Sequence, residues 1–285
     1  MQLRGDQAFF LSLNVAQRES LLALRQQACC QPPLDGISWR CGAIHLGWLA
    51  PQRASWLARQ LMQSTLYAQE LVWHADNWTP MQRSETLQRA LLQARAEGLL
   101  QGWRDERFGF WGADCAVPDP QRSTFLQVER SGFRFLGLLS HAVHVNGFMP
   151  DGRLWCGRRS LHKATDPGLL DNITAGGLPS GEGVQECLRR ELAEEAGLFR
   201  LEEHGCESVE RVRTSRLEGD SWHDEFLHVF NLTVAADFQP INQDGEVSEF
   251  LCLRPDEVLA KIQAGAFTQD AVQAMVQGLF AQLQS

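Results

Sequence analysis

The sequence has no long apolar run, no excess of positive charge and no paired cysteines. None of the apolar stretches in its 285 residues approaches the roughly 18 residues that a transmembrane helix needs, so no membrane contact is predicted. With a net charge of −9 and a pI of about 5.4, the chain is not expected to bind nucleic acid or anionic membranes non-specifically. The eight cysteines form no CxxC pair and have no zinc-ligand spacing with histidine, so no zinc site is predicted.

The N-terminus also lacks the features of a secretory signal peptide. Its apolar stretch is interrupted at Asn14, and no small-residue cleavage site follows. Scattered cysteines without such a signal favour reduced thiols. The sequence therefore predicts a cytoplasmic protein.

Length and composition predict two domains. The chain is longer than a typical single domain, and 44% of its residues are hydrophobic, which is enough for a sizeable core. Residues 1–122 mix helical and extended patterns and predict a smaller α/β domain of unknown role. A polar, proline-containing stretch at residues 115–124 predicts a linker. Residues 123–285 then form the second domain, whose order of strands, helix, strands and helices suits an α/β/α sandwich around a mixed sheet.

Several elements can be placed along the chain. Residues 37–49, 133–149 and 226–234 are rich in β-branched and aromatic residues and predict extended segments. Thr79 followed by proline predicts a helix start, and Thr268 predicts another.

The most informative stretch is residues 176–198, which read GGLPSGEGVQECLRRELAEEAGL. Its glycines fit a loop with unusual backbone angles, and the run that follows Gly183 is rich in helix formers. On a helix, Glu191, Glu194 and Glu195 share one face. Three carboxylates so close repel one another and need a cation. Hard divalent ions prefer oxygen ligands, so the spacing indicates a Mg²⁺ site that also takes substrate phosphate oxygens.

The full pattern is G-x5-E-x7-R-E-L-x-E-E-x-G-L, in which Arg190 can hold Glu182 by a charge-assisted pair. This pattern resembles the Nudix box, the signature of metal-dependent diphosphate hydrolases, with every specified position filled. The resemblance implies a Nudix α/β/α sandwich that uses Mg²⁺, or Mn²⁺ in its place, to hydrolyse a small-molecule diphosphate. It implies a metal site made of Gly176, Glu182, Glu191, Glu194 and Glu195.

The general base of such a reaction is left open by the sequence. Glu194 is the candidate inside the box, with Arg190 as its catalytic neighbour. In other Nudix branches a glutamate outside the box serves, and Glu246 or Glu249 could take that role here. Glu246 is the first choice of these two, and it is equally compatible with an ordinary turn after Asp244.

A basic cluster precedes the box. Arg158, Arg159 and Lys163 are expected to neutralise the diphosphate of the substrate. The organic half of the substrate needs an aromatic wall, and nothing in the sequence chooses among the candidates. These are Phe148, Trp155 and Trp222 in the second domain, and Trp103, Phe108 and Trp111 in the first.

The motif RRS-x2-K-x3-PG-x-LDN-x2-AGG at residues 158–177, with HVNGF upstream, is similar to one branch of the Nudix superfamily. Its members carry an extra N-terminal domain, and one fungal relative is fused to thiamine pyrophosphokinase. The resemblance implies removal of a phosphate from thiamine diphosphate or from its oxidised and damaged analogues. The N-terminal domain either caps the site or forms a homodimer contact.

Three alternatives remain. A nucleotide diphosphate such as ADP-ribose, NADH or a nucleotide sugar is the main competing substrate class. Isopentenyl diphosphate isomerase shares the basic motif, yet it needs a cysteine just after the asparagine, where this chain has Thr174. A non-catalytic ligand-binding regulator would be expected to lose box carboxylates, and this chain keeps them all.

Overall fold

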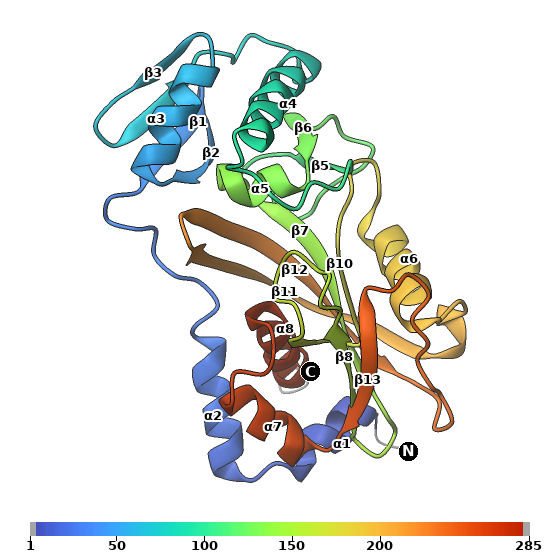
Figure 1. Cartoon of the computed structure of the whole chain (residues 1–285). Helices are drawn as coiled ribbons and strands as arrows, with labels where there is room; N and C mark the ends of the chain where they lie inside the picture. The colour runs from blue at the N-terminus through green and yellow to red at the C-terminus, as the bar shows by residue number, and fades with distance from the viewer. Residues whose placement is uncertain (1–3, 282–285) are drawn as a thin grey trace.

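The computed structural model describes residues 4–281 and shows a mixed α/β protein built around two main sheets (Figure 1). A four-stranded sheet in the first half has the strand order β2-β1-β4-β3. A seven-stranded sheet in the second half has the order β11-β12-β7-β8-β13, with β10 paired to β7 and β9 paired to β8. The predicted fold class is therefore confirmed: an α/β region precedes an α/β/α sandwich around a mixed sheet.

The helices are α1 (Gly5–Ser12), α2 (Val15–Arg25), α3 (Pro51–Gln60), α4 (Pro80–Ala96), α5 (Ser131–Leu136), α6 (Val184–Ala196), the 3-10 turn η1 (Leu201–Glu203), α7 (Pro255–Gln263) and α8 (Gln269–Phe280). The strands are β1 (Ile37–Cys41), β2 (Ile44–Leu49), β3 (Ser64–Leu66), β4 (Glu70–Trp73), β5 (Arg107–Phe110), β6 (Leu126–Glu129), β7 (Ser140–Phe148), β8 (Leu154–Arg159), β9 (Leu170–Asp171), β10 (Thr174–Gly177), β11 (Gly205–Glu218), β12 (Ser221–Thr233) and β13 (Val247–Leu253).

The large sheet is covered on both faces, which explains why every residue of β7 is buried. Alternate side chains of a strand point to opposite faces. Val143 and Val145 share a hydrophobic cluster with Leu188 and Leu192 of α6. Phe148 packs on the other face with α1, α7 and α8 (Figure 1). The strand also buries His141, His144 and Asn146, and each of these polar side chains has a hydrogen-bond partner within the protein.

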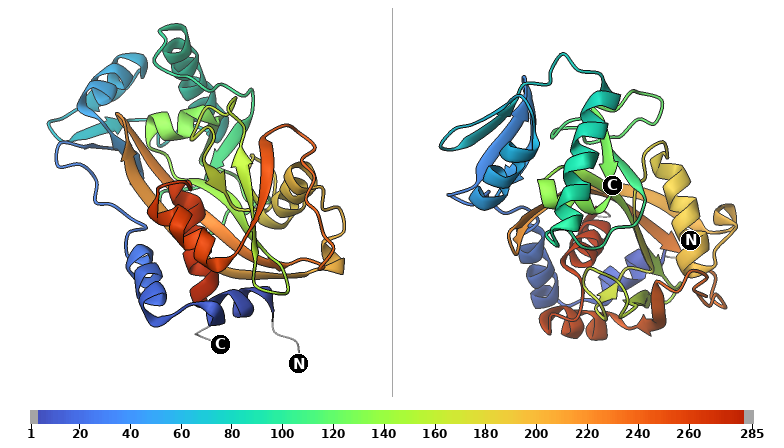
Figure 2. Two further views of the ribbon diagram at one scale, coloured as in Figure 1. Left: turned by 60° about the horizontal axis from the view of Figure 1, so that its bottom comes forward. Right: turned by 45° about the horizontal axis from the view of Figure 1, so that its top comes forward.

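Helices α1 and α2 pack against the second half of the chain. Phe9 meets Phe148 edge-on, with ring centroids 5.9 Å apart, and Phe10 meets Phe280 at 5.6 Å. Both views in Figure 2 place these helices beside α7 and α8, away from the small sheet. The predicted boundary between residues 122 and 123 stays a prediction, and these contacts place residues 5–25 against the large sheet's own helices.

The small sheet, α3 and α4 form a separate core that docks on α5, immediately before β7. The closest approach is between two glycines, since a Cβ on Gly47 would lie 1.8 Å from the carbonyl oxygen of Gly137. Arg53 of α3 adds a hydrogen bond of 3.0 Å to the carbonyl oxygen of Phe135 and an ion pair with Asp220. These contacts hold the N-terminal region against α5 and the turn between β11 and β12 (Figure 1).

Two of the predicted extended segments differ from the structure. Residues 37–49 form the hairpin of β1 and β2 instead of one strand. Residues 133–149 were expected to be extended throughout, yet 131–136 form helix α5. Gly137 ends that helix in the left-handed conformation, with a φ of 63°, which glycine adopts at little cost. The helix starts at Thr79 and Thr268 are confirmed, because both side chains accept a hydrogen bond from a backbone N–H of the first turn.

The third predicted segment, 226–234, is only part of a much longer hairpin made of β11 and β12. The first strand of this hairpin, β11, carries many charged residues, and its buried and exposed side chains do not alternate regularly. The period-two pattern of apolar residues that marks a half-buried strand is therefore weak there. The β11 strand pairs with β12 from residue 205 to residue 218. The turn of this hairpin reaches α3 and α5, as Figure 1 shows.

Two neighbouring strands of the large sheet bring His141 and His228 together, with their ring nitrogens 3.2 Å apart. Burial, followed by the charge of His228, lowers the pKa of His141 to about 3. Burial, followed by the charge of Arg211, lowers the pKa of His228 to about 4. Both rings are therefore neutral in the folded protein at pH 7.

This pair predicts a loss of stability in mild acid. Between pH 6.5 and these lowered pKa values the unfolded chain binds protons that the folded chain does not. The free energy of unfolding should then fall by up to about 1.4 kcal/mol per pH unit for each histidine. Urea unfolding between pH 7 and 4.5 measures this slope. The double variant His141→Gln/His228→Gln should have a visibly flatter profile, and an unchanged slope would show that the pair carries none of it.

Candidate active site

The loop from β10 to α6 and the first three turns of α6 carry the carboxylates of the box. Helix α6 begins after Gly183, whose backbone N–H donates to the Glu186 carboxylate at 2.8 Å, and it ends at Gly197, which is left-handed with a φ of 67°. Gly176 lies directly against the helix. A Cβ on this residue would lie 1.8 Å from the carboxyl carbon of Glu191. Only glycine therefore allows this carboxylate to approach β10.

Arg190 is the centre of the acidic cluster. Its guanidinium donates to Glu182 from Nε and Nη2, each at 2.9 Å. Its Nη1 donates to Glu191 at 2.7 Å and to Glu194 at 3.1 Å. The fork of an arginine can hold several carboxylates in one plane. The predicted pair between Arg190 and Glu182 is therefore present, and the same guanidinium fixes two carboxylates of α6.

Glu195 lies one turn beyond Glu191 and is also held against β10. Its carboxylate accepts hydrogen bonds from the Thr174 hydroxyl at 2.6 Å and from the Ala175 backbone N–H at 2.9 Å. Lys163 completes the set, with its Nζ 3.2 Å from Glu195 and 2.6 Å from Glu246. Lys163 thus joins a box carboxylate to a glutamate that lies 51 positions further along the chain.

The electrostatics of this group call for more positive charge than the protein supplies. Burial, followed by the charge of Glu195, raises the pKa of Glu191 to about 8. Burial also raises the pKa of Glu195, against the charge of Lys163 and the hydrogen bond from Thr174. A cation placed between two neighbouring carboxylates whose pKa values are raised in this way would favour their ionised forms.

The predicted basic cluster divides in the structure. Lys163 and Arg159 line a cavity beside the box, and Arg159 pairs with Asp171 at 2.7 Å. Arg158 turns the other way, where it pairs with Glu249 and donates to the carbonyl oxygen of Gly168 at 3.0 Å. Of the two candidate bases outside the box, Glu246 lines the cavity and Glu249 is engaged by Arg158.

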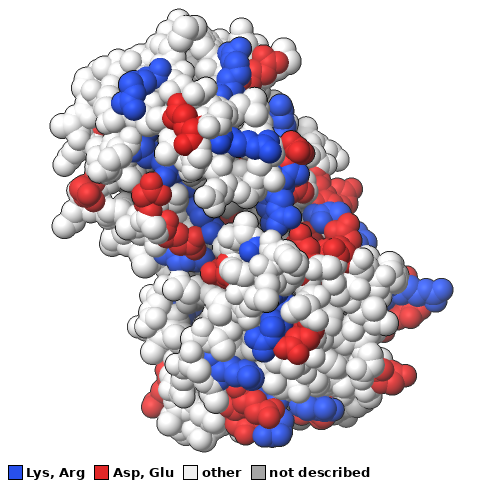
Figure 3. Space-filling view, in the orientation of Figure 1, with Lys and Arg blue, Asp and Glu red and all other residues white. Residues whose placement is uncertain are grey.

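The cavity has a volume of about 380 Å³ and lies between the N-terminal region and the large sheet. Its floor is the face of the sheet that carries Ser140, Ala142 and Gly177. Three arginines that were not predicted also line it: Arg104 from the N-terminal region, Arg130 from the residue before α5 and Arg134 from α5. Arg104 lies 3.6 Å from Glu246. Positive and negative side chains accordingly mix across the middle of the face seen in Figure 3.

Phe108 is the aromatic candidate that reaches this cavity. It packs against Gly177, where a Cβ would lie 2.4 Å from the ring. Phe133 of α5 lines the cavity next to it and was not predicted. Phe148, Trp155 and Trp222 are buried at 7% exposure or less and do not line it. Among the described residues, Trp103 and Trp111 do not line it either.

The two cysteines nearest to the box in the sequence, Cys156 and Cys187, are fully buried. Burial raises the pKa of both thiols far above their usual range. A nucleophile or acid needs an accessible thiol with a low or ordinary pKa. These residues therefore do not supply the catalytic cysteine of an isomerase.

None of the helices within residues 4–281 is both long and apolar enough to cross a membrane.

The NUDIX domain family matches residues 140–274. The chain is 31% identical over 200 residues to Nudix hydrolase 24, chloroplastic, of Arabidopsis thaliana, covering 69% of this chain and 53% of the plant protein. It thus spans about half the length of that relative.

A curated protein and a solved structure from Deinococcus radiodurans are also similar. A Nudix hydrolase is 32% identical over 125 residues, covering 42% of this chain and 68% of the relative. The crystal structure of DR0079 superposes with a TM-score of 0.46 and 23% identity, covering 61% of this chain and 99% of the other. The NUDIX match contains the whole acidic cluster, and the first of these relatives is covered over more than two thirds of its length, so the chain belongs to the Nudix hydrolase family.

Proposed function

We propose that this protein is a divalent-metal-dependent diphosphate hydrolase that removes a phosphate from thiamine diphosphate or from its oxidised and damaged analogues. The observation that carries the proposal is the position of Gly176 and Gly177 of the box, which line a cavity of about 380 Å³. Gly176 also lies directly against the Glu191 carboxyl group. Lys163, Arg130 and Arg159 line the same cavity, so a diphosphate bound there would meet positive side chains close to the box.

The donor set fits Mg²⁺ or Mn²⁺. Glu182, Glu191, Glu194 and Glu195 would hold the ion, together with the carbonyl oxygen of Gly176, and all of these are oxygen donors. The raised pKa of Glu191 supports this assignment, because a nearby cation would favour the ionised form. When bound, such an ion neutralises diphosphate oxygens and makes water a better nucleophile at neutral pH.

The protein's own groups would position the reactants and move one proton. A water oxygen attacks one phosphorus, the bridging P–O bond breaks, and the water proton passes to a carboxylate. Glu246 fits this role because Lys163 and Arg104 keep it ionised: burial works to raise its pKa, and the hydrogen bond and charge of Lys163 outweigh burial and lower it. Glu194 is the alternative base. Lys163 and Arg159 stabilise the charge that develops on the leaving phosphate oxygen.

The thiamine assignment rests on the motif at residues 158–177 and is the finer part of the proposal. The cavity size supports a small substrate, since pockets of this volume enclose ligands of a few rings. The eight free cysteines support a reducing compartment such as the cytoplasm. The N-terminal region lines the cavity through Gln101, Arg104 and Phe108, which supports a capping role, and a homodimer contact stays a prediction.

A substrate panel tests the proposal. Hydrolysis in Mg²⁺ is measured with thiamine diphosphate, oxothiamine diphosphate, oxythiamine diphosphate, ADP-ribose and NADH, as orthophosphate for the three thiamine compounds and as AMP for the two nucleotides. We expect turnover of the thiamine compounds with a kcat/KM at least tenfold above that of the nucleotides, and monophosphate plus orthophosphate as products. Turnover of the nucleotides alone would show that the substrate assignment is wrong while the chemistry stands. No turnover of any compound by the metal-loaded protein would favour a ligand-binding regulator instead.

A further inference from the structure

A chain of hydrogen-bonded side chains runs through the protein interior from the cavity to helix α1. Its members are all at 5% exposure or less, and each contacts the next in the order His144, Asn172, Asn146, Asn231 and Asp6. The four contacts measure 2.8, 2.8, 3.0 and 2.9 Å in that order. His144 lines the cavity, and Asp6 ends the chain in the first turn of α1.

The fold makes room for this chain at the centre of the large sheet. Asn146 and Asn231 are register partners on the neighbouring strands β7 and β12, and both lie against Gly278 of α8. A Cβ on Gly278 would lie 2.3 Å from Asn146 Nδ2 and 2.4 Å from Asn231 Oδ1. Glycine is unfavourable in the interior of a helix. Its use here lets α8 approach the two amides closely.

Backbone carbonyl groups of α8 fix the direction of the hydrogen bonds in the chain. Asn231 Nδ2 lies 2.9 Å from the carbonyl oxygen of Gly278. Asn146 Nδ2 lies 3.0 Å from the carbonyl oxygen of Ala274. A carbonyl oxygen only accepts, so each of these amides must present its NH₂ group there. Asn146 Oδ1 therefore accepts from Asn172 Nδ2, which leaves Asn172 Oδ1 for the next contact.

The same reasoning fixes the tautomer of His144. Asn172 Oδ1 can only accept, so His144 Nδ1, which is 2.8 Å away, must carry hydrogen and donate it. A neutral imidazole has one protonated nitrogen, so Nε2 keeps its lone pair. Within residues 4–281, no group donates a hydrogen bond to Nε2, and the ring lines the cavity. His144 therefore offers an acceptor to a ligand.

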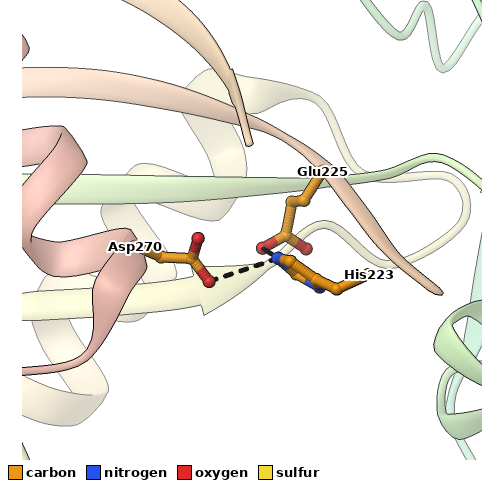
Figure 4. A group of neighbouring side chains, drawn as sticks. All are labelled: His223, Glu225 and Asp270. Atoms are coloured by element: carbon orange, nitrogen blue, oxygen red, sulfur yellow. Dashed lines mark ion pairs between the residues drawn. The ribbon is translucent and has the colours of Figure 1, made fainter. Parts of the chain in front are cut away.

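The other histidine at the cavity wall is already engaged by protein groups. Figure 4 shows His223 pointing toward Asp270 and Glu225. Arg134 Nη2 lies 3.1 Å from His223 Nδ1, and the Asp270 carboxylate lies 3.2 Å from His223 Nε2. Both ring nitrogens of His223 thus face charged partners. Of the histidines that the structure describes at this wall, His144 is the one that keeps a nitrogen for a ligand.

The position of His144 in the sheet favours the organic half of the substrate over the diphosphate. Val143 and Val145 pack with α6, and alternate side chains of a strand point to opposite faces, so His144 points away from the box helix. Diphosphate oxygens accept hydrogen bonds, and the lone pair of Nε2 would repel them. Lys163 and Arg159, which are cations at the same cavity, suit the diphosphate instead.

We propose that His144 is a substrate-binding residue, whose Nε2 accepts a hydrogen bond from an N–H or O–H group in the organic half of the substrate. The chain from Asn172 to Asp6 is the positioning device that holds its tautomer. The proposal rests on the function proposed above, because the diphosphate must occupy the box end of the cavity. Thiamine diphosphate, its oxo and oxy analogues and the adenine nucleotides all carry such a donor, so the contact orients the substrate without rejecting any of them.

Nitrogen NMR of the full-length protein tests the tautomer and the ligand contact. Two-bond ¹H–¹⁵N spectra of protein labelled at histidine are recorded at pH 8, alone and with thiamine diphosphate or ADP-ribose, with Ca²⁺ in place of Mg²⁺ to limit turnover. The His144 signals are those lost in His144→Gln or in His144→Leu. We expect Nδ1 to have the shift of a protonated nitrogen and Nε2 that of an unprotonated one. Ligand binding should move Nε2 toward the protonated value.

Dissociation constants of two matched variants test the same contact by titration calorimetry. In His144→Gln the side-chain Oε1 can accept in place of Nε2, so binding should stay within about threefold of the wild type. His144→Leu has no acceptor, so binding should weaken by at least about tenfold. His74→Leu, at an exposed position just after β4, should bind as the wild type does. A purely structural role for His144 would not move the Nε2 resonance on ligand addition.

The outcomes separate this inference from the proposed function. An unprotonated Nε2 that shifts when either compound binds supports the contact, as does weaker binding in His144→Leu. If only ADP-ribose produces these effects, the thiamine assignment fails and the role of His144 stands. A protonated Nε2 in the free protein would overturn the contact, and so would a resonance that stays in place when a compound binds. Failure of both compounds to bind would overturn it as well. Hydrolysis of a thiamine compound with an unresponsive Nε2 would overturn the contact and leave the proposed function intact.

Discussion

Glu191→Gln is expected to remove most hydrolysis and, at the same time, to make the metal-free protein more stable. The glutamine keeps the size of the side chain and loses the charge that a divalent ion needs, so kcat should fall by at least about a hundredfold. In the metal-free protein, the ionised Glu191 is unfavourable at pH 7, because burial and the charge of Glu195 raise its pKa from the ordinary 4.5 to about 8. Removing this acid should raise the free energy of unfolding by about 1–3 kcal/mol.

The loss of stability caused by ionised Glu191 is confined to a defined pH range. As the pH rises from 4.5 to about 8, the unfolded chain loses the Glu191 proton before the folded chain does. The stability of the metal-free wild-type protein should therefore decline over that range relative to Glu191→Gln. Thermal unfolding in EDTA at pH 5, 7 and 8.5 measures the difference. A variant that is less stable than the wild type at pH 7 would contradict the assignment of Glu191 to a cation site.

Glu194→Gln is the matched control for stability. Its carboxylate is 46% exposed in the ion pair with Arg190, and exposed pairs of this kind contribute little to folding. The variant should melt within a few degrees of the wild type and still lose most turnover in saturating Mg²⁺. Wild-type turnover in both Glu191→Gln and Glu194→Gln would show that the box carboxylates do not carry the reaction.

Gly176→Ala should have the second largest effect. The added Cβ would occupy the space of the Glu191 carboxyl group, at 1.8 Å from its carbon. The obstructed group is the end of a side chain and not backbone, so the carboxylate can turn away while the fold survives. We expect kcat to fall by about a hundredfold or more, since misplacement of a group by about 1 Å costs that much, with a small change in melting temperature.

Gly205→Ala provides the comparison for this change. A Cβ at Gly205 would meet its nearest neighbour at 3.9 Å, and its backbone is not in the left-handed region. Orthophosphate release and the affinity for Mn²⁺ are measured for both variants. If Gly176→Ala keeps wild-type turnover, then the close contact between β10 and Glu191 has no part in placing the carboxylate.

The candidate site was predictable where the chemistry lies in one continuous segment. The spacing of residues 176–198 places Arg190 beside Glu182, and the structure has that pair. Helix starts at Thr79 and Thr268 were predictable for the same reason, since a cap is a local hydrogen bond. The position of the basic cluster was predictable only in part. Lys163 and Arg159 line the cavity, whereas the pairing of strands β8 and β13 places Arg158 beside Glu249.

The site residues and elements that the sequence did not predict depend on contacts between segments far apart in the chain. Arg104 reaches the cavity because the N-terminal region docks on α5, and Arg130 and Arg134 reach it from α5 and the residue before it. No local pattern in the sequence marks these three arginines. His223 and Glu225 alternate along β12 on the cavity face, yet the charged composition of residues 205–224 concealed the hairpin that carries them. Residues 131–136 were predicted to be extended because the segment is short and Gly137 interrupts it, so it shows too little helical periodicity. The packing of the segment in the folded protein makes it helix α5.

The most direct test of the account compares release of the hydrolysis product from the best substrate of the panel in Mg²⁺ and in EDTA, for the wild type and for Glu191→Gln. The account predicts release by the wild type in Mg²⁺, no release in EDTA, full recovery when Mg²⁺ is restored, and at least a hundredfold lower rate for Glu191→Gln in Mg²⁺. Release that persists in EDTA, or that Glu191→Gln performs at the wild-type rate, would contradict the claim that these carboxylates form a metal-dependent hydrolytic site.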